Sequence, residues 1–108
     1  MDELTKQIYQ GLHEKINWES FTHSVMCEMY SAQLNAHIKD YTEKLATDEG
    51  RLLPAMYQIR VRAQIEAYIL LVVDLTEKAI ELFLAEGFTE QEQAEYYPKE
   101  MGDWGEGA

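Results

Sequence analysis

The stretch "VRAQIEAYILLVVDLTEKAIEL", residues 61–82, decides the fold class. Its apolar residues recur at alternating intervals of four and three: Val61, Ile65, Tyr68, Val72, Leu75, Ala79 and Leu82. Because an α-helix has 3.6 residues per turn, this spacing places them on one face of a long helix. In residues 58–65, polar and apolar residues also alternate, as they would in a strand, but this alternation stops at Glu66. The longer pattern therefore predicts a helix over about residues 54–86.

The limits of this helix follow from residues that interrupt a helical backbone. In "TDEGRLLP", residues 47–54, Gly50 can take a left-handed cap conformation and Pro54 suits a first helical turn. At the other end, Gly87 can cap the last turn, with Phe88 folding back onto it. The long helix is expected between these two breaks.

A short fourth helix is predicted after the second break. The sequence "TEQE", residues 89–92, has the threonine-to-glutamate spacing of a capping box, and Pro98 would end the helix that it starts. The following "KEMGDWGEGA" contains three glycines and few residues that could pack. Residues 99–108 are therefore predicted to form a flexible acidic tail.

A second long helix is predicted from residue 18 to about residue 47, with Asn17 as its N-cap. Its apolar residues fall on two faces. One face holds Trp18, Phe21, Val25, Met29, Ala32 and Ala36. The nearly opposite face holds Cys27, Leu34, Ile38, Tyr41 and Leu45. The faces overlap in the middle of the helix, which we expect to be covered on both sides.

The N-terminal residues carry a third helical pattern, a stripe of Leu4, Ile8, Leu12 and Ile16. This stripe predicts a short amphipathic helix. Together the patterns predict an all-α protein, a small helical bundle with two long helices (about 18–47 and 54–86) between a short N-terminal and a short C-terminal helix. A chain of 108 residues is long enough for one core, so residues 1–98 are expected to form a single helical domain.

The charge of the chain is strongly acidic. Twenty aspartates and glutamates against nine lysines and arginines give a formal net charge of −11. Affinity for a phosphate backbone comes from basic side chains, so this balance disfavours direct binding to nucleic acid. The same field attracts a basic surface on a partner protein and speeds its encounter.

The cellular compartment is indicated by three features. The single cysteine, Cys27, cannot form a disulfide within the chain and fits a reducing compartment. The N-terminal "MDELTKQIYQ" lacks the basic and apolar regions of a signal peptide. The longest apolar run, residues 67–73, is far shorter than the ~20 residues that span a bilayer. We expect a soluble cytoplasmic protein that does not enter a membrane.

Arg62 and Glu66 stand at the head of the most apolar run, four residues apart on the predicted helix, where they can form an ion pair. Two interpretations remain open: the pair sets the register of packed helices or of a self-association surface, or it is a solvated pair at a rim. Catalysis is disfavoured because the acid, nucleophile or metal that would cooperate with a lone carboxylate is not evident.

Ala67, Leu70 and Leu71 lie off the heptad stripe of residues 61–82. A monomer of three layers would leave them uncovered, which favours contact with a second copy of the chain. With Arg62 and Glu66, they are the predicted self-association residues.

Candidate metal ligands are weak. Glu19, His23 and Cys27 are spaced by four residues and would form one stripe of a helix. Thiolate and imidazole suit zinc, but a structural site normally has four ligands, and His13 and His37 have no cysteine at ligand spacing. We predict no metal site.

Candidate catalytic groups are equally weak. Cys27 in the middle of a helix has neither a helix N-terminus nor an oxyanion hole beside it. The six glycines do not form a phosphate-binding loop after a strand. We therefore predict no catalytic residue and no cofactor, and we expect the chain not to be an enzyme.

The C-terminal segment combines acidic and aromatic residues. Its acids are Glu86, Glu90, Glu92, Glu95, Glu100, Asp103 and Glu106, against Lys99 alone. Aromatic anchors in an acidic setting suit docking onto a basic partner, and the predicted partner-binding residues are Glu90, Glu92, Glu95, Tyr96, Tyr97 and Trp104. The alternative is a solvated fourth helix followed by a frayed tail.

Two hypotheses on function follow. The first is a non-enzymatic acidic protein–protein interaction module that occupies a basic, nucleic-acid-binding surface of a partner, as an inhibitor of phage or mobile-element origin would. The second is a homo-oligomeric helical subunit with a structural or assembly role, whose helices bury their second apolar faces against further copies.

Overall fold

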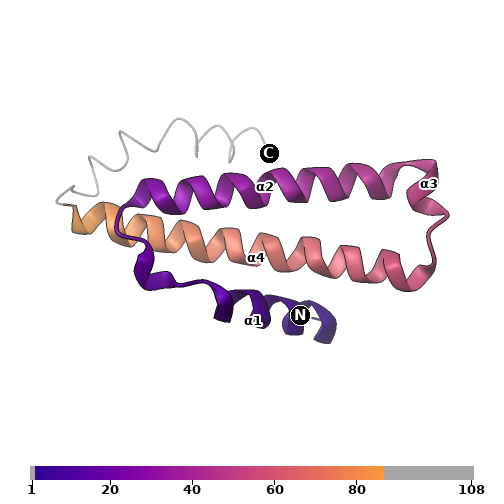
Figure 1. Ribbon diagram of the computed structural model, residues 1–108, viewed down its shortest axis with the longest axis horizontal. Helices are drawn as coiled ribbons and strands as arrows, with labels where there is room; N and C mark the ends of the chain where they lie inside the picture. Colours follow the sequence, from indigo (N-terminus) through magenta and orange to yellow (C-terminus); the bar gives the residue numbers. More distant parts are fainter. Residues whose placement is uncertain (1, 87–108) are drawn as a thin grey trace.

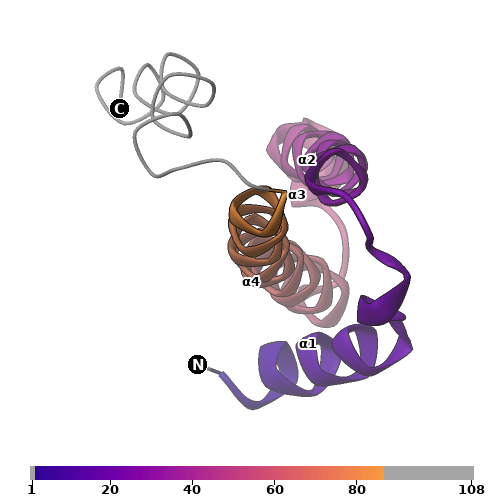
Figure 2. The same cartoon turned by 90° about the vertical axis from the view of Figure 1, so that its left-hand side faces the viewer.

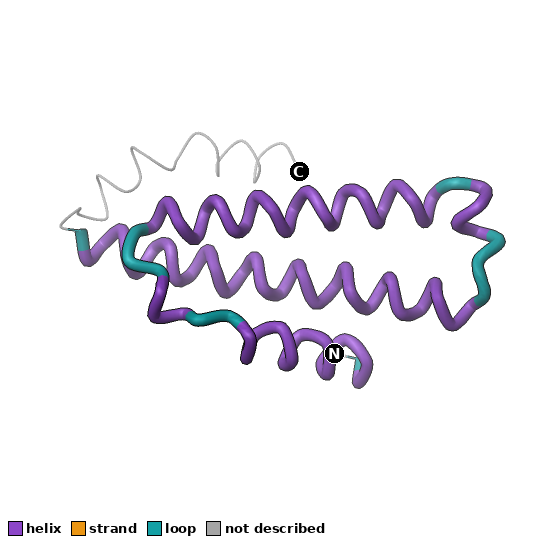
Figure 3. The backbone as a smooth tube through the Cα atoms, viewed as in Figure 1, coloured by secondary structure: helices purple, strands orange, loops and turns teal. Residues whose placement is uncertain are grey.

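The computed structural model describes residues 2–86. Its elements are α1 (Glu3–Lys15), the 3₁₀-helix η1 (Trp18–Ser20), α2 (Ser24–Ala46), α3 (Asp48–Arg51) and α4 (Ala55–Ala85). Within this part of the chain there is no β-strand (Figure 3). The all-α fold is therefore confirmed, and so is the long helix predicted over residues 54–86. The predicted fourth helix and tail lie outside the described residues.

The two long helices, α2 and α4, run side by side as an antiparallel hairpin (Figure 1). α1 lies along α4 on a different side from α2, so α4 is the central helix of the described bundle (Figure 2). Thr5 contacts Glu66 and Tyr9 contacts Asp74, which means that α1 and α4 run in the same direction. The chain thus enters α2 and leaves α4 at the same end.

The core forms where α4 meets both of its neighbours. Its buried cluster consists of Cys27, Leu34, Leu71, Leu75 and Ala79. On α4 the most buried residues recur every fourth position: Ala63, Ala67, Leu71, Leu75, Ala79 and Phe83. The predicted heptad stripe shares Leu75 and Ala79 with this line, and its other members are partly buried. The line of most buried residues differs from the predicted heptad stripe because α4 packs against α1 and α2 at once. The residues between these two contacts are therefore the most buried.

The second long helix begins later than predicted. Trp18–Ser20 is a 3₁₀ turn, α2 starts at Ser24, and Asn17 makes no side-chain capping bond. The indole N–H of Trp18 donates to the carbonyl oxygen of His13 at 3.1 Å. The backbone N–H of Phe21 donates to the carbonyl oxygen of Trp18 at 3.3 Å. These bonds shape the connection from α1 to α2. The predicted start at residue 18 was therefore wrong by six residues.

The expectation that α2 is covered on both faces was also wrong. Cys27 and Leu34 face α4 and are buried, but the opposite face, formed by Val25, Met29, Ala32 and Ala36, is exposed. Trp18 and Phe21, assigned to that face, instead pack on the core from the connection before the helix. In the described structure α2 is a surface helix with one packed face.

Gly50 belongs to the four-residue helix α3, not to a left-handed cap. It is buried, and a Cβ at this position would lie 2.1 Å from the carbonyl oxygen of Lys44. The hydroxyl of Thr47 accepts from the backbone N–H of Gly50 at 3.0 Å and caps α3. Pro54 is the residue just before α4 and not part of its first turn. Close approach of two backbones, and not a special φ angle, requires glycine here.

Gly50→Ala is therefore expected to lower the free energy of unfolding by about 1 to 3 kcal/mol. The added methyl group meets backbone, which cannot rotate away as a side chain can, so the α2–α3 turn must shift. Chemical denaturation followed by circular dichroism measures the loss. Gly11→Ala is the matched control, because a Cβ there meets nothing within 4 Å and alanine favours a helix. Equal stability of the two variants would contradict this account.

Candidate interaction surfaces

The charges of the described residues are unevenly distributed along the bundle. Residues 2–35 and 67–86, here called the acidic half, carry nine carboxylates against three lysines. Residues 36–66, the turn half, carry five carboxylates and five basic side chains. The bundle is therefore electrically polar, and the acidic half contains the end at which the C-terminal segment leaves α4 (Figure 1).

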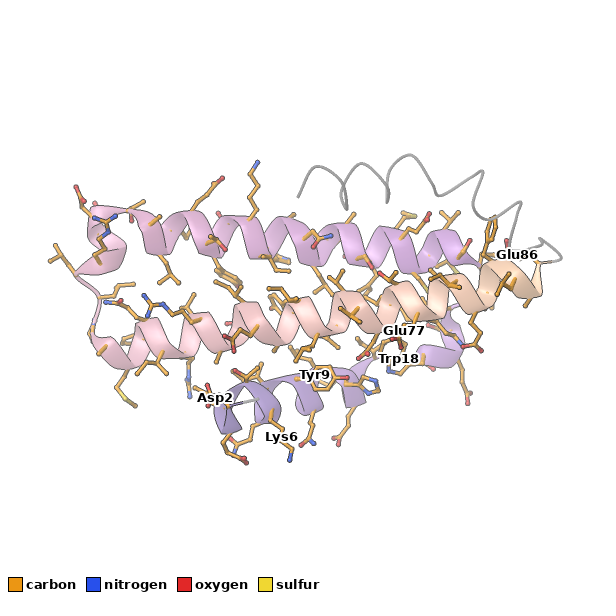
Figure 4. All side chains as sticks on the ribbon, turned by 180° about the vertical axis from the view of Figure 1, so that it is seen from behind. Asp2, Lys6, Tyr9, Trp18, Glu77 and Glu86 are labelled. Atoms are coloured by element: carbon orange, nitrogen blue, oxygen red, sulfur yellow. The ribbon has the colours of Figure 1, made fainter. Side chains whose placement is uncertain are left out.

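α4 carries a row of carboxylates along one side: Glu66, Asp74, Glu77 and Glu81. At 100° per residue these four positions fall within an arc of about 80°. The hydroxyl of Thr5 donates to Glu66 Oε2 at 2.9 Å, and the phenol of Tyr9 donates to Asp74. Figure 4 shows Tyr9 between α1 and α4, whereas Lys6 points away from α4. Glu66 and Asp74 thus hold α1 in place, and all four carboxylates add negative charge to the surface.

Asp74 is the centre of this contact. It accepts from the Tyr9 hydroxyl, and its Oδ2 lies 3.8 Å from His13 Nε2. The hydrogen bond to Asp74, then desolvation, then repulsion by Asp74 and Glu77 raise the pKa of Tyr9 to about 12. The phenolate is disfavoured because it would lie beside two carboxylates. Tyr9 therefore keeps its proton well above the usual pKa of a tyrosine, about 10.

This shift predicts a pH dependence. A group with a raised folded-state pKa stabilises the fold below its unfolded pKa, about 10, and the contribution is lost as the pH rises through about 12. The difference in unfolding free energy between wild type and Tyr9→Phe should be constant up to about pH 10 and should shrink towards pH 12. Urea denaturation at a series of pH values measures it. A difference that does not change over this range would contradict the assigned contact.

A second polar contact joins the start of α2 to the end of α4. The Glu86 carboxylate accepts from the backbone N–H of Ser24 at 3.2 Å and lies 3.7 Å from His23 Nδ1. A carboxylate at a helix N-terminus satisfies an otherwise unpaired N–H and interacts well with the helix dipole. In the sequence Glu86 is the first acid of the C-terminal segment, yet its position at the end of α4 (Figure 4) makes it the cap of α2.

The three candidate metal ligands do not form a stripe. Glu19 lies in η1, His23 precedes α2, and Cys27 alone is inside that helix. Cys27 is fully buried, and burial raises the pKa of its thiol. Among residues 2–86 there is no group of three or more histidine, cysteine, aspartate or glutamate side chains placed to hold a metal ion.

The predicted self-association residues separate into two groups. Ala67 and Leu71 are buried by the chain's own helices, and Leu70 is partly buried. Arg62 and Glu66 are exposed, but the ion pairs of residues 2–86 do not include one between them. Glu66 accepts from Thr5 instead. Ala67 and Leu71 are therefore not available to a second copy in this fold.

A hollow of about 200 Å³ lies between α1, α2 and α4, lined by Leu12, Tyr30, Gln33, Leu34, His37, Tyr68 and Leu71. The rings of His37, Tyr41 and Tyr68 lie next to one another beside it, with centroids 6.2 to 6.3 Å apart. The lining includes no carboxylate, lysine or arginine. It therefore offers aromatic and apolar contact but no charged group to orient a ligand.

The turn half ends in an apolar tip. Leu52, Leu53, Met56 and Tyr57 are exposed there, next to Arg51. No helix of the described chain is long and apolar enough to cross a membrane.

The predicted partner-binding residues from Glu90 to Trp104 lie outside the described residues. The contacts of Asp74 and Glu86 were not predicted, because their partners are 65 and 62 residues away and no local pattern links them. Comparisons with protein-family models, curated proteins and solved structures found no match.

Proposed function

We propose that the chain is a non-enzymatic protein–protein interaction module whose acidic half and acidic C-terminal segment occupy a basic surface of a partner protein. The observation that supports this function is the separation of charge along the bundle. The acidic half has a net charge of −6, from nine carboxylates and three lysines, whereas the turn half has no net charge, and residues 87–108 add six carboxylates against a single lysine. Within residues 2–86, the net negative charge therefore lies in the acidic half.

The carboxylates of the acidic half are available to a partner. All are exposed except Asp74, which is partly buried. Exposed charges act through water over about one Debye length, roughly 8 Å at physiological salt. Their main contribution is to speed association with a basic surface and to make it sensitive to salt.

The charge density limits what the surface can imitate. From Glu66 to Glu81 the row on α4 spans about 22 Å at 1.5 Å per residue, or about 7 Å between neighbouring carboxylates. A strand of B-DNA has one phosphate every 3.4 Å or so. The row therefore supports competition for a basic nucleic-acid-binding surface better than full imitation of a duplex. An inhibitor of phage or mobile-element origin that acts in the cytoplasm is the form of this proposal that we favour.

The test is affinity capture from a nuclease-treated extract of the native host, with three versions of the chain as bait. Wild type should retain a basic protein, and nucleic acid should displace it. Glu77→Gln with Glu81→Gln should weaken the retention, most strongly at low salt. Glu43→Gln with Glu49→Gln removes the same charge from the turn half and should not. Equal retention by both double variants would contradict a role for the acidic half.

The second candidate function is the homo-oligomeric structural or assembly subunit. One observation favours it: α4 has an exposed apolar face away from both of its neighbours.

A further inference from the structure

The exposed face of α4 carries a second heptad pattern. Its positions alternate in steps of three and four: Ile59, Arg62, Glu66, Ile69, Val73, Thr76 and Ile80. We call these residues, with Leu84 one turn beyond, the outer stripe. Large apolar side chains along it are substantially exposed: Ile59 51%, Ile69 47%, Val73 49% and Leu84 37%. Figure 2 shows that α1 and α2 leave this side of α4 uncovered.

We propose that the outer stripe binds the outer stripe of a second copy, with the two α4 helices antiparallel and the twofold axis at the level of residue 71, on the exposed side of the helix. The core positions of a heptad are called a and d, and in an antiparallel coiled coil each a position faces a d position of the other helix. Applied here, Ile69 faces Val73 of the second copy, and Val73 faces its Ile69. These two central layers are apolar in both directions.

The outer layers also match. Ile59 lies opposite the end of α4 in the second copy, next to Leu84. Arg62 lies opposite Ile80, and Glu77 and Glu81 of the second copy both lie beside Ile80, on the flank that carries the row of carboxylates. Glu81 pairs with Lys78 of its own helix at 3.8 Å, but its side chain is 72% exposed, so an arginine of the second copy can also reach it. The stripe therefore has apolar contact at its centre and ends. Between them, Arg62 meets carboxylates of the second copy and Glu66 lies opposite its Thr76.

The charge distribution favours the antiparallel arrangement. A parallel pair would place Arg62 against Arg62, Glu66 against Glu66, and one acidic half beside the other. Like charges in contact are destabilising. An antiparallel pair places the turn half of each copy, which has no net charge, beside the acidic half of the other. A twofold, self-complementary contact of this kind is also the commonest symmetry of homo-oligomers.

This surface replaces the predicted one. Arg62 and Glu66 remain in it, but Ile69 and Val73 take the place of Ala67 and Leu71, which lie inside the core. α4 has 31 residues, about 45 Å, which gives roughly four heptads of contact. Such a narrow contact belongs with small interfaces, below about 1,200 Å², and we expect micromolar affinity.

Sedimentation velocity of the full chain, from about 5 to about 200 µM, tests the contact. Wild type should change from monomer to dimer, while Ile69→Glu and Val73→Glu should remain monomeric over the whole range. Val25→Glu is the control, because it places the same charge on the exposed face of α2 and should leave dimerisation unchanged. Circular dichroism verifies that each variant is folded. A wild type that is monomeric at the highest concentration would overturn the proposal, as would a Val25→Glu variant that abolishes the dimer.

The orientation is tested by cross-linking. Ile69→Cys and Val73→Cys are each treated with a thiol oxidant alone and as a mixture; native Cys27 is fully buried. The antiparallel contact predicts a disulfide-linked dimer mainly in the mixture, joining position 69 of one copy to 73 of the other. Efficient linkage of each variant to itself, or no linkage in the mixture, would overturn the antiparallel arrangement.

A charge exchange tests the register. Arg62→Glu should weaken the dimer, because it faces Glu77 and Glu81 of the second copy. Combining it with Glu77→Arg and Glu81→Arg should restore dimerisation, since the same pairs form with reversed sign. Failure of the combined variant to dimerise, while it remains folded by circular dichroism, would overturn this register.

Discussion

Replacement of Leu75 by alanine is expected to lower the free energy of unfolding by about 2 to 5 kcal/mol. Leu75 is fully buried in the cluster that joins α2 to α4. The substitution removes apolar contact and leaves a cavity that rigid neighbours fill only in part. Alanine is the best helix former, so the loss arises from tertiary packing and not from the helix itself.

Urea denaturation followed by far-UV circular dichroism measures this loss. Leu52→Ala is the matched control: it removes the same atoms from a side chain that is 84% exposed, and it should change stability by less than about 0.5 kcal/mol. A loss of less than about 1 kcal/mol for Leu75→Ala would show that this position is not the packed centre of the bundle.

The sequence predicts that Leu75 lies in a helix, but it does not predict which face of a helix is buried. The 3-4 spacing that includes Leu75 is a property of one helix, so it predicts that helix without knowledge of its neighbours. Which of two apolar faces becomes buried depends on the position of the other helices. Val25 and Cys27 both lie on predicted faces of α2, yet only Cys27 is covered by α4.

The start of α2 was missed for a related reason. Trp18 and Phe21 are spaced as they would be on a helix, and local pattern favours one. Their actual conformation depends on the indole bond to His13 and on packing against the core. The true N-terminus of α2 is capped by Glu86, which lies 62 residues further along the chain. A signal of that kind cannot be found by inspection of adjacent residues.

The candidate surfaces divide in the same way. The excess of acids is visible in the composition, and the acidic C-terminal segment is visible as a run. Two other features cannot be predicted without knowing that α1 pairs with α4. They are the attachment of α1 through Tyr9 and Asp74, and the polarity of the bundle. Arg62 and Glu66 were predicted as partners of each other because they are four residues apart, but Glu66 bonds to Thr5.

The C-terminal segment provides the second prediction with a large expected effect. If it docks onto a basic partner, its acids and its aromatic rings should act on different rate constants. Neutralising Glu90, Glu92 and Glu95 to glutamine should slow association and flatten its dependence on salt, because these charges act before contact. Glu43→Gln with Glu49→Gln is the control for a change of net charge away from the segment.

Trp104→Ala or Tyr97→Ala should instead speed dissociation. A buried aromatic anchor typically costs ~2 kcal/mol or more on truncation, which corresponds to roughly a thirtyfold faster dissociation. Surface plasmon resonance with the captured partner separates the two rate constants. Deletion of residues 99–108 tests Trp104 together with the end of the chain and leaves Tyr97 in place. If the deletion and the glutamine substitutions both leave the affinity unchanged, the segment does not dock. The partner would then have to bind the exposed carboxylates of α1 and α4, where Glu77→Gln with Glu81→Gln would be the variant that weakens it.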